Sequence, residues 1–143
     1  MTWLSADWTA SSAVDIDYLA LRERGVRALL FDLDRTLGPR RARHLPERAQ
    51  HLLASLASEG FRIGILSNRR RPKNDPVIEQ LAERHALLHT AGKPRRRGYL
   101  ALLERLDATA SEAAMIGDKW ITDILGAKRL GMFAIRVRRP IRD

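Results

Sequence analysis

Short apolar runs alternate along this chain with segments whose apolar residues recur every three or four positions. Runs typical of buried strands occupy residues 28–31, 62–66, 86–89, 113–116 and 132–137. Helical spacing occupies residues 15–24, 49–57, 99–106 and 121–130, and glycine follows several of these segments as a stop. This alternation predicts a parallel sheet with helices on both faces. Because parallel crossovers are right-handed, we expect an α/β fold that is doubly wound and Rossmann-like, with five mainly parallel strands.

The length of 143 residues predicts one domain spanning residues 1–143, in which residues 1–25 form a helical lead-in. No apolar stretch approaches the roughly 18 residues of a membrane span, and the N-terminus lacks the pattern of a secretory signal. We therefore expect a cytoplasmic protein, with peripheral contact to the inner face of a membrane left open. The absence of cysteine excludes disulfides, thiolate metal sites and cysteine nucleophiles.

The charge is strongly positive, because 26 lysine and arginine residues face 17 aspartate and glutamate residues. The resulting +9 charge favours polyanionic partners such as nucleic acid, an anionic membrane surface or phosphorylated substrates. An arginine-rich coding bias would also raise the total. It would not explain the placement of arginines in three clusters: Arg40, Arg41 and Arg43; Arg69, Arg70 and Arg71; and Arg95, Arg96 and Arg97.

Two carboxylates, Asp32 and Asp34, directly follow the strand predicted at residues 28–31. Paired carboxylates beside an apolar core repel each other unless a cation binds them, so they indicate a divalent-metal site. The bland alternative is a pair of turn or capping aspartates. In doubly wound folds ligands bind beyond the carboxyl ends of the strands, which is where this pair is predicted to lie.

Polar residues also follow the next strands. Ser67 and Asn68 follow residues 62–66 and suit phosphoryl oxygens, although a turn or helix cap explains them equally well. Lys93 follows residues 86–89 and is suited to neutralising an anion, although a solvated surface lysine is the commoner case. Gly117 and Asp118 follow residues 113–116, and Asp123 is either part of a metal site or a helix cap.

Taken together, these residues resemble the motifs of the haloacid dehalogenase superfamily. Residues 32–36 match the motif DxDxT, Ser67 and Lys93 match the second and third motifs, and Gly117, Asp118 and Asp123 match GDxxxxD. The segments at residues 15–19 and 24–32 further resemble YqeG-type members of subclass IIIA, whose relatives include the mitochondrial phosphatidylglycerophosphate phosphatase. Arg35 departs from the asparagine expected in that group, and Lys119 from the common glutamine.

The resemblance implies a Mg²⁺-dependent phosphatase. Asp32 would attack phosphorus and form an aspartyl-phosphate, and Asp34 would act as general acid and then base. Mg²⁺ would be held by Asp32, the Asp34 backbone carbonyl and Asp118, with support from Asp123. Thr36, Ser67 and Lys93 would help to position and neutralise the phosphoryl group.

The chain lacks room for a cap domain, so an open site and a large substrate are expected. The arginine clusters and Asn68 are candidates for binding that substrate, in particular Arg35, Arg40, Arg69, Arg70 and Arg95. The leading expectation is an anionic phospholipid headgroup, phosphatidylglycerophosphate, with Trp3 and Trp8 either anchoring at the membrane or packing on the domain. Alternatives are a phosphatase of nucleic-acid ends or other phosphorylated macromolecules, and a non-catalytic phospho-receiver or nucleic-acid-binding module. Few aromatics accompany the arginines, which weakens the nucleic-acid reading.

Overall fold

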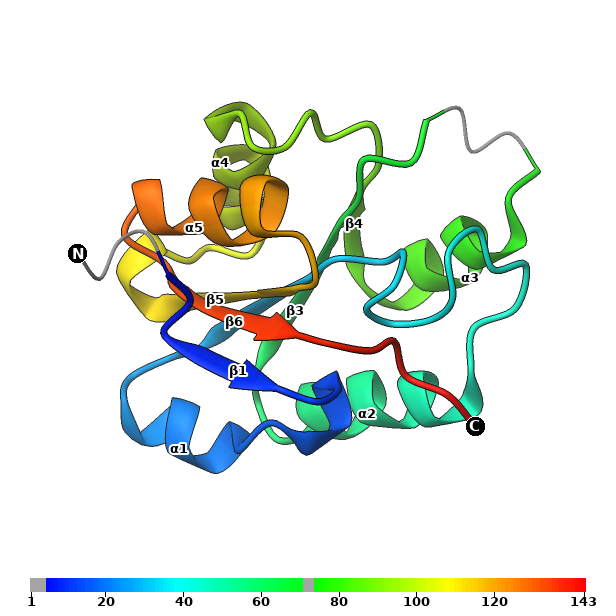
Figure 1. The fold of residues 1–143 in the computed structure, drawn as a ribbon, viewed down its shortest axis with the longest axis horizontal. Coiled ribbons are helices and arrows are strands. Elements are labelled where there is room, and N and C mark those ends of the chain that lie inside the picture. Colours follow the sequence, from blue (N-terminus) through cyan, green and yellow to red (C-terminus); the bar gives the residue numbers. More distant parts are fainter. Residues whose placement is uncertain (1–4, 71–73) are drawn as a thin grey trace.

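The strands form a parallel sheet in the order β1-β6-β5-β2-β3-β4 in a computed structural model that describes residues 5–70 and 74–143. Figure 1 shows the sheet with helices above and below it. The strands are β1 (Trp8–Ala10), β2 (Ala28–Phe31), β3 (Arg62–Leu66), β4 (Ala86–Leu88), β5 (Ala113–Gly117) and β6 (Phe133–Val137). The fold is therefore the doubly wound α/β fold that the sequence predicts, and Trp3 lies outside the described residues.

The sheet has six strands, where the sequence pattern predicts five. The additional strand, β1, has three residues and pairs with β6, so that Trp8 lies opposite Ile135. Such a short edge strand carries no apolar run that periodicity detects. It is anchored by an edge-to-face contact between the rings of Trp8 and Phe133, whose centroids lie 5.0 Å apart. The predicted helical lead-in therefore also contains a strand.

The helices are α1 (Tyr18–Glu23), α2 (Glu47–Ser58), α3 (Pro76–Arg84), α4 (Arg96–Arg105) and α5 (Gly126–Arg129). Three-residue 3₁₀ turns occupy Ala13–Asp15 and Ala110–Glu112, and a π-helical turn occupies Trp120–Leu125. The helix predicted at residues 15–24 starts later, because the Asp17 side chain accepts the backbone N–H of Ala20 and caps α1. The segment predicted as a helix at residues 121–130 is divided between the π-helical turn and α5.

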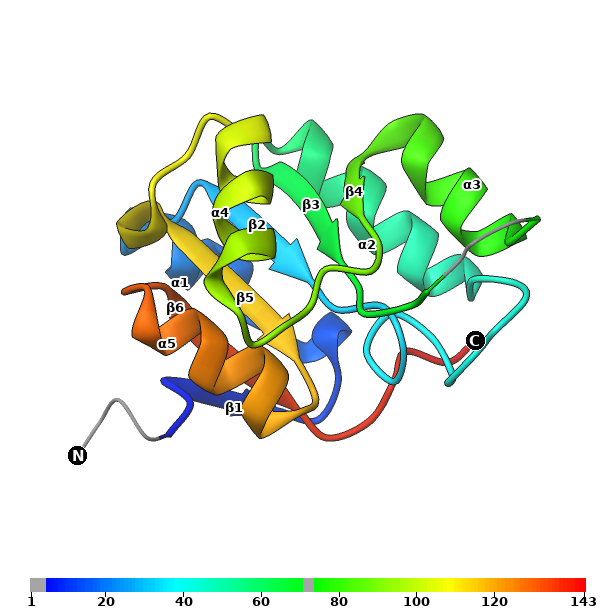
Figure 2. The ribbon, with the colours of Figure 1, turned by 90° about the horizontal axis from the view of Figure 1, so that it is seen from above.

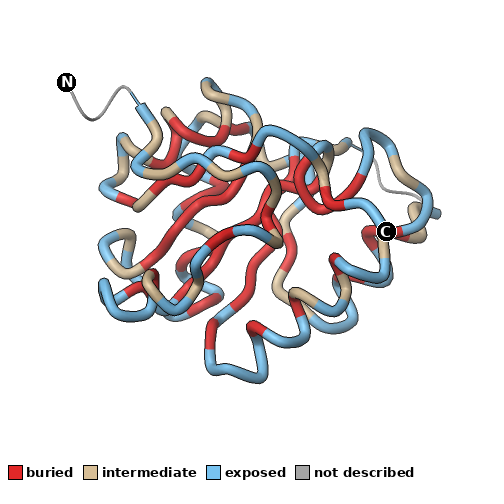
Figure 3. The backbone as a smooth tube through the Cα atoms, turned by 60° about the horizontal axis from the view of Figure 1, so that its bottom comes forward, coloured by how far each residue is buried: buried red, intermediate tan, exposed pale blue. Residues whose placement is uncertain are grey.

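The sheet is covered on both faces, as Figures 1 and 2 show. Successive residues of β2 face opposite sides, so Leu29 and Phe31 belong to one apolar cluster and Ala28 and Leu30 to the other. The first cluster includes residues of α1, α2 and α3, and the second includes residues of α4 and α5. The central strands are buried along their length (Figure 3), which explains their continuous apolar runs.

The strand order creates a crevice between β2 and β5. From β2 the chain adds β3 and β4 on one side, then crosses to add β5 and β6 on the other. The connections after β2 and β5 therefore diverge at their carboxyl ends, which is where doubly wound sheets bind ligands. Asp32 follows β2 and Asp118 follows β5, so the topology brings both to this crevice.

Candidate active site

The ammonium group of Lys93 bridges two carboxylates at the bottom of the crevice. Its Nζ donates to Asp32 Oδ1 at 2.9 Å and to Asp123 Oδ1 at 2.6 Å. The Lys93 side chain is 2% exposed, and that of Asp123 is fully buried. Burial lowers the pKa of Lys93, but the two carboxylates outweigh this effect and raise it, so the lysine stays charged. The site thus has an internal cation that holds two acidic side chains together.

The π-helical turn (Trp120–Leu125) carries Asp123 inward beneath β5. A side chain on Gly117 would lie within 2.3 Å of Asp123 Oδ2, so only glycine permits this approach. Asp123 Oδ2 accepts the backbone N–H of Lys119 at 3.1 Å, and the buried Tyr99 hydroxyl donates to the carbonyls of Thr122 and Asp123. Both carboxylate oxygens of Asp123 are therefore occupied by protein groups.

Asp118 differs from Asp123, because its Oδ1 is buried and has no hydrogen-bond partner among the described residues. One carboxylate oxygen from each of Asp32, Asp118 and Asp123 lies within 4.8 Å of the others. Three carboxylates then face one ammonium group, an imbalance that a cation would relieve. The cluster can hold a metal ion, and Asp118 Oδ1 is the oxygen that has no hydrogen-bond partner among the described residues.

Burial and mutual repulsion raise pKa values in the acidic cluster, which consists of Asp32, Asp118 and Asp123. Burial, together with the charge of Asp123, raises the pKa of Asp32 to about 7, although Lys93 opposes the shift. Burial and the charge of Asp123 likewise raise the pKa of Asp118. A divalent cation bound among them would favour the ionised carboxylates and remove this disadvantage.

The raised pKa predicts how stability depends on pH when no metal is bound. Folded Asp32 keeps its proton up to about pH 7, whereas in the unfolded chain it is released near 3.8, so stability falls between these values as pH rises. The slope approaches about 1.4 kcal/mol per pH unit for one such proton. His85, with a pKa lowered by burial, acts in the opposite direction just below its ordinary value of 6.5.

Urea denaturation between pH 4.5 and 7.5 in a chelator isolates the contribution of Asp32 when the protein is compared with Asp32→Asn. We expect the fall in stability to be smaller in the variant, and to be smaller in the wild-type protein when Mg²⁺ is added. Equal pH slopes for the two proteins without metal would contradict the assignment to Asp32.

Ser67 and Asn68 lie at the end of β3 and organise the loop that carries Lys93. The Asn68 amide donates to the Lys93 carbonyl at 3.1 Å and accepts the Lys93 N–H at 2.9 Å. The buried Ser67 hydroxyl accepts the backbone N–H of Arg69 at 3.0 Å. Asn68 thus clamps the backbone of Lys93, an arrangement that its position in the sequence does not reveal.

Thr36 and Asp34 belong to the turn after β2. Thr36 is fully buried, and its hydroxyl oxygen has no hydrogen-bond partner among the residues described. Asp34 is half-buried, and its carboxylate accepts the backbone N–H of Arg41 and the guanidinium of Arg69. Burial raises the pKa of Asp34, but the hydrogen bonds and charge of Arg69 and the Arg41 N–H outweigh it and lower the pKa below its ordinary value.

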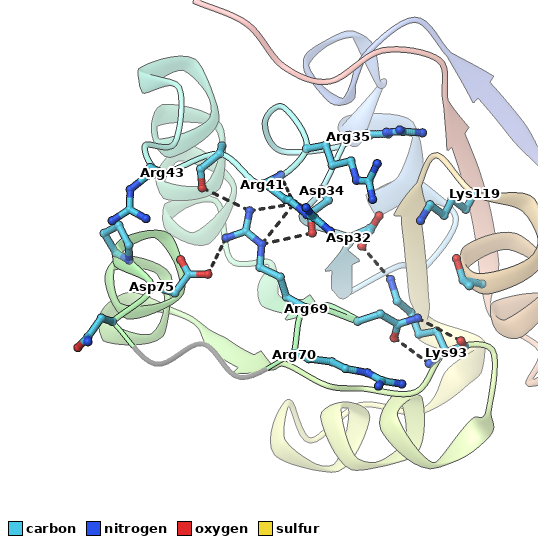
Figure 4. Close-up of a pocket in the computed structure, with 16 residues that line it drawn as sticks. Asp32, Asp34, Arg35, Arg41, Arg43, Arg69, Arg70, Asp75, Lys93 and Lys119 are labelled. Carbon is cyan, nitrogen blue, oxygen red and sulfur yellow. Dashed lines mark hydrogen bonds and ion pairs between the residues drawn. The ribbon is translucent and has the colours of Figure 1, made fainter.

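A cavity of about 600 Å³ reaches the acidic cluster at Asp32 and at its partner Lys93, which both line it (Figure 4). Basic side chains dominate its lining: Arg35, Arg40, Arg41, Arg43, Arg69, Arg70, Lys93 and Lys119. Asp32, Asp34 and Asn68 also line it. The first two arginine clusters thus reach this cavity, apart from Arg71, which lies outside the described residues.

Two expectations from the sequence differ from this geometry. The third arginine cluster, residues 95–97, does not line the cavity. Arg95 is exposed at the N-terminus of α4, and Arg96 and Arg97 belong to the first turn of that helix. Asp75 also lines the cavity, although its sequence context does not indicate a binding residue. The pair Asp75-Pro76 is typical of a helix start, because a capping residue is followed by proline in the first turn, and it predicts the beginning of α3. Nothing in the sequence pattern pointed to Tyr99 beyond its place on an apolar helix face.

Comparisons with known proteins agree with the fold and the site. A family model for haloacid dehalogenase-like hydrolases matches residues 5–131. The chain is 26% identical over 117 residues to the protein named Probable phosphatase YqeG of Bacillus subtilis, with coverage of 82% of this chain and 67% of the relative. It is 31% identical over 130 residues to chloroplastic phosphatidylglycerophosphate phosphatase 1 of Chlamydomonas reinhardtii, with coverage of 86% and 48%. The chain thus spans about half the length of the algal relative.

Solved structures show the same fold. An uncharacterized protein from Corynebacterium glutamicum superposes with a TM-score of 0.67 at 21% sequence identity, covering 80% of this chain and 87% of that one. With the family match over residues 5–131, these findings confirm the resemblance seen in the motifs. The chain belongs to the haloacid dehalogenase-like hydrolases and is an enzyme of the phosphatase branch of that family.

Proposed function

We propose that this protein is a Mg²⁺-dependent phosphatase that removes the terminal phosphate of phosphatidylglycerophosphate. The observation that carries the proposal is the acidic cluster, whose Asp32 and its partner Lys93 line an open cavity rich in arginine. The named activity of the algal relative supports the lipid substrate. A phosphoryl group fits this cavity because arginine and lysine neutralise its oxygens while the carboxylates lie beneath it.

The proposed reaction has two steps. A carboxylate oxygen of Asp32 bonds to phosphorus as the bond to the leaving oxygen breaks, and Asp34 donates a proton to that oxygen. Asp34 then takes a proton from water, whose oxygen bonds to phosphorus and releases inorganic phosphate and the Asp32 carboxylate. The negative phosphoryl group beside Asp34 raises its pKa and so favours the protonated form needed in the first step.

Asp32, Asp118 and the Asp34 carbonyl would hold Mg²⁺ in this proposal, with Asp123 in support. When bound, the cation neutralises charge on the phosphoryl oxygens. Lys93 adds a fixed positive charge, and Asn68 holds the backbone of Lys93. Thr36, whose buried hydroxyl has no hydrogen-bond partner among the described residues, is proposed to help position the phosphoryl group. Ser67, which accepts the Arg69 N–H, is proposed to position the loop and donate its hydroxyl hydrogen to the phosphoryl group.

We also propose that the domain spans residues 1–143 and is capless. The connection from Gly38 to α2 contains no helix or strand, and α3 is the helix described between β3 and β4. An open cavity of this kind admits the headgroup of a lipid that stays in a membrane or micelle. None of the helices in residues 5–70 and 74–143 has the length and apolar character needed to cross a bilayer.

The test is Mg²⁺-dependent phosphate release from phosphatidylglycerophosphate in mixed micelles, beside p-nitrophenyl phosphate and a 3′-phosphorylated oligonucleotide. We expect kcat/KM for the lipid to exceed the other two by about tenfold or more. Equal, weak activity on all three would overturn the lipid assignment and leave the phosphatase chemistry. Preference for the oligonucleotide would favour the nucleic-acid alternative, and no release from any substrate would favour a binding module.

The arginine lining gives a second prediction for the same assay. Arg40→Ala removes one exposed cation from the cavity, so we expect KM for the lipid to rise by about three- to tenfold with little change in kcat. Arg129→Ala on α5 is the matched control, because it removes the same charge from an exposed position outside the cavity. An equal effect of both variants would show that overall charge, rather than the lining, attracts the substrate.

A further inference from the structure

The guanidinium of Arg69 lies between two carboxylates at the mouth of the cavity (Figure 4). Nη2 lies 2.8 Å from Asp34 Oδ1, and Nε lies 3.3 Å from each oxygen of Asp34. Nη1 lies 2.8 Å from Asp75 Oδ2, and Nη2 also donates to the carbonyl of Ala42 at 3.4 Å. One N–H of Nε, two of Nη2 and one of Nη1 are therefore used within the protein, out of five.

These contacts are shielded from solvent. The side chain of Arg69 is 12% exposed, that of Asp34 25% and that of Asp75 19%. A forked contact between arginine and carboxylate fixes orientation as well as distance. The backbone N–H of Arg41 donates to Asp34 Oδ1 at 2.8 Å, so the carboxylate is held from two directions.

The neighbouring Arg70 provides a contrast. It lines the same cavity and is exposed, and it makes no ion pair or hydrogen bond among the described residues. Both arginines follow β3 and both were selected from the sequence as substrate-binding residues. Among the described residues, the guanidinium of Arg70 has all five N–H groups free for a phosphate, whereas that of Arg69 has one.

Asp75 connects Arg69 to a rigid part of the fold. Its Oδ1 accepts the backbone N–H groups of Val77 and Ile78 and so caps α3. Val77 and Ile78 are buried in the core beneath that helix. The chain of contacts from α3 through Asp75 and Arg69 therefore ends on the carboxylate of Asp34.

We infer that Arg69 is a positioning residue, which holds the Asp34 carboxylate in place by linking it to Asp75 at the start of α3, and that it does not itself bind the phosphate of the substrate. The inference rests on the proposed function, in which Asp34 transfers protons. A displacement of about 1 Å in such a group lowers the rate by on the order of 10²-fold, so losing Arg69 acts on kcat.

The test is a double-mutant cycle that combines Arg69→Ala with Asp34→Asn, with p-nitrophenyl phosphate and Mg²⁺. We expect Arg69→Ala alone to lower kcat by on the order of 10- to 100-fold. In the Asp34→Asn background, the same change should alter kcat and KM less than about threefold, because the group it positions is already lost. Using this background also removes the unpaired Asp34 charge, which would otherwise repel phosphate.

Arg70→Ala is the matched control, and we expect it to raise KM to a similar extent in both backgrounds. If Arg69→Ala raises KM in the Asp34→Asn background as much as Arg70→Ala does, Arg69 binds substrate and the inference is wrong. Asp32→Asn tests the proposed function separately, since full activity in that variant would overturn the chemistry without involving Arg69.

Two further measurements do not depend on the Ala variant, and the second of them does not depend on activity. Asp75→Asn keeps an oxygen to cap α3 but weakens the ion pair, so kcat should fall about two- to fivefold with KM unchanged. A crystal structure of Arg69→Lys should show the Asp34 side chain displaced, because lysine lacks the planar fork. An unmoved Asp34 carboxylate in that structure, or an unchanged kcat for Asp75→Asn, would overturn the inference.

Discussion

Replacing Asp32 by asparagine is expected to lower turnover of every phosphomonoester by about 10⁴-fold or more while the protein remains folded. The amide has the size of the carboxylate but is not a nucleophile, so the proposed covalent step cannot occur. Stability should not suffer at neutral pH without metal, because the change removes a buried carboxylate whose pKa is raised by burial and by Asp123.

The decisive measurement is acid-quenched labelling with a ³²P-phosphomonoester beside steady-state phosphate release. Wild-type protein should retain label, and Asp34→Asn should retain more of it if the breakdown of the intermediate needs a base. Asp15→Asn is the matched control, because it changes an exposed aspartate in the 3₁₀ turn before α1. A burst of product or retained label with Asp32→Asn would rule out Asp32 as the nucleophile.

Replacing Lys93 by methionine is expected to have the largest effect on stability. The side chain keeps its length, but Asp32 and Asp123 then face each other in a buried site without the ammonium group that lies 2.9 and 2.6 Å from them. Removing one partner of a buried ion pair costs about 3–5 kcal/mol. For a chain of this length, the midpoint of thermal unfolding should fall by roughly 10 °C or more.

Thermal unfolding at neutral pH in a chelator, followed by circular dichroism, measures this effect. Lys128→Met is the matched control, because Lys128 pairs with Asp7 at 2.7 Å in a more exposed position; it should cost less than about 1 kcal/mol. The double variant Lys93→Met with Asp123→Asn should recover part of the loss, since it leaves one fewer unpaired charge. If Lys93→Met unfolds no earlier than Lys128→Met, the buried bridge does not stabilise the fold.

The sequence pattern was sufficient to predict the parallel sheet and the place of the crevice, because both follow from the periodicity of apolar residues along the backbone. Strands β2 and β3 coincide with their predicted bounds, and the motif residues at the ends of β2, β4 and β5 meet where the topology requires. Periodicity fails where an element is too short to repeat, as in β1. It also fails where a capping side chain makes a helix start later than the apolar spacing predicts, as Asp17 does at α1.

The use of each polar side chain could not be predicted in the same way. Arg69 and Arg70 are neighbours of identical type, and only folding brings Asp34, 35 positions away in sequence, beside one of them. The side chain of Asn68 is of a type suited to binding phosphate, but in the structure it forms hydrogen bonds with the backbone of Lys93. Such choices depend on pairs of residues distant in sequence, to which a pattern of local apolar spacing is insensitive.

The π-helical turn has a practical consequence for spectroscopy. It begins with Trp120, whose neighbours Lys119 and Thr122 line the cavity, whereas Trp8 lies on β1, separated from β5 by β6. With Trp3 and Trp8 replaced by phenylalanine, the indole of Trp120 becomes the sole tryptophan emitter, in the same π-helical turn as Asp123. Its fluorescence would then report the binding of a cation or of inorganic phosphate in real time, in a protein that keeps all the carboxylates of the acidic cluster.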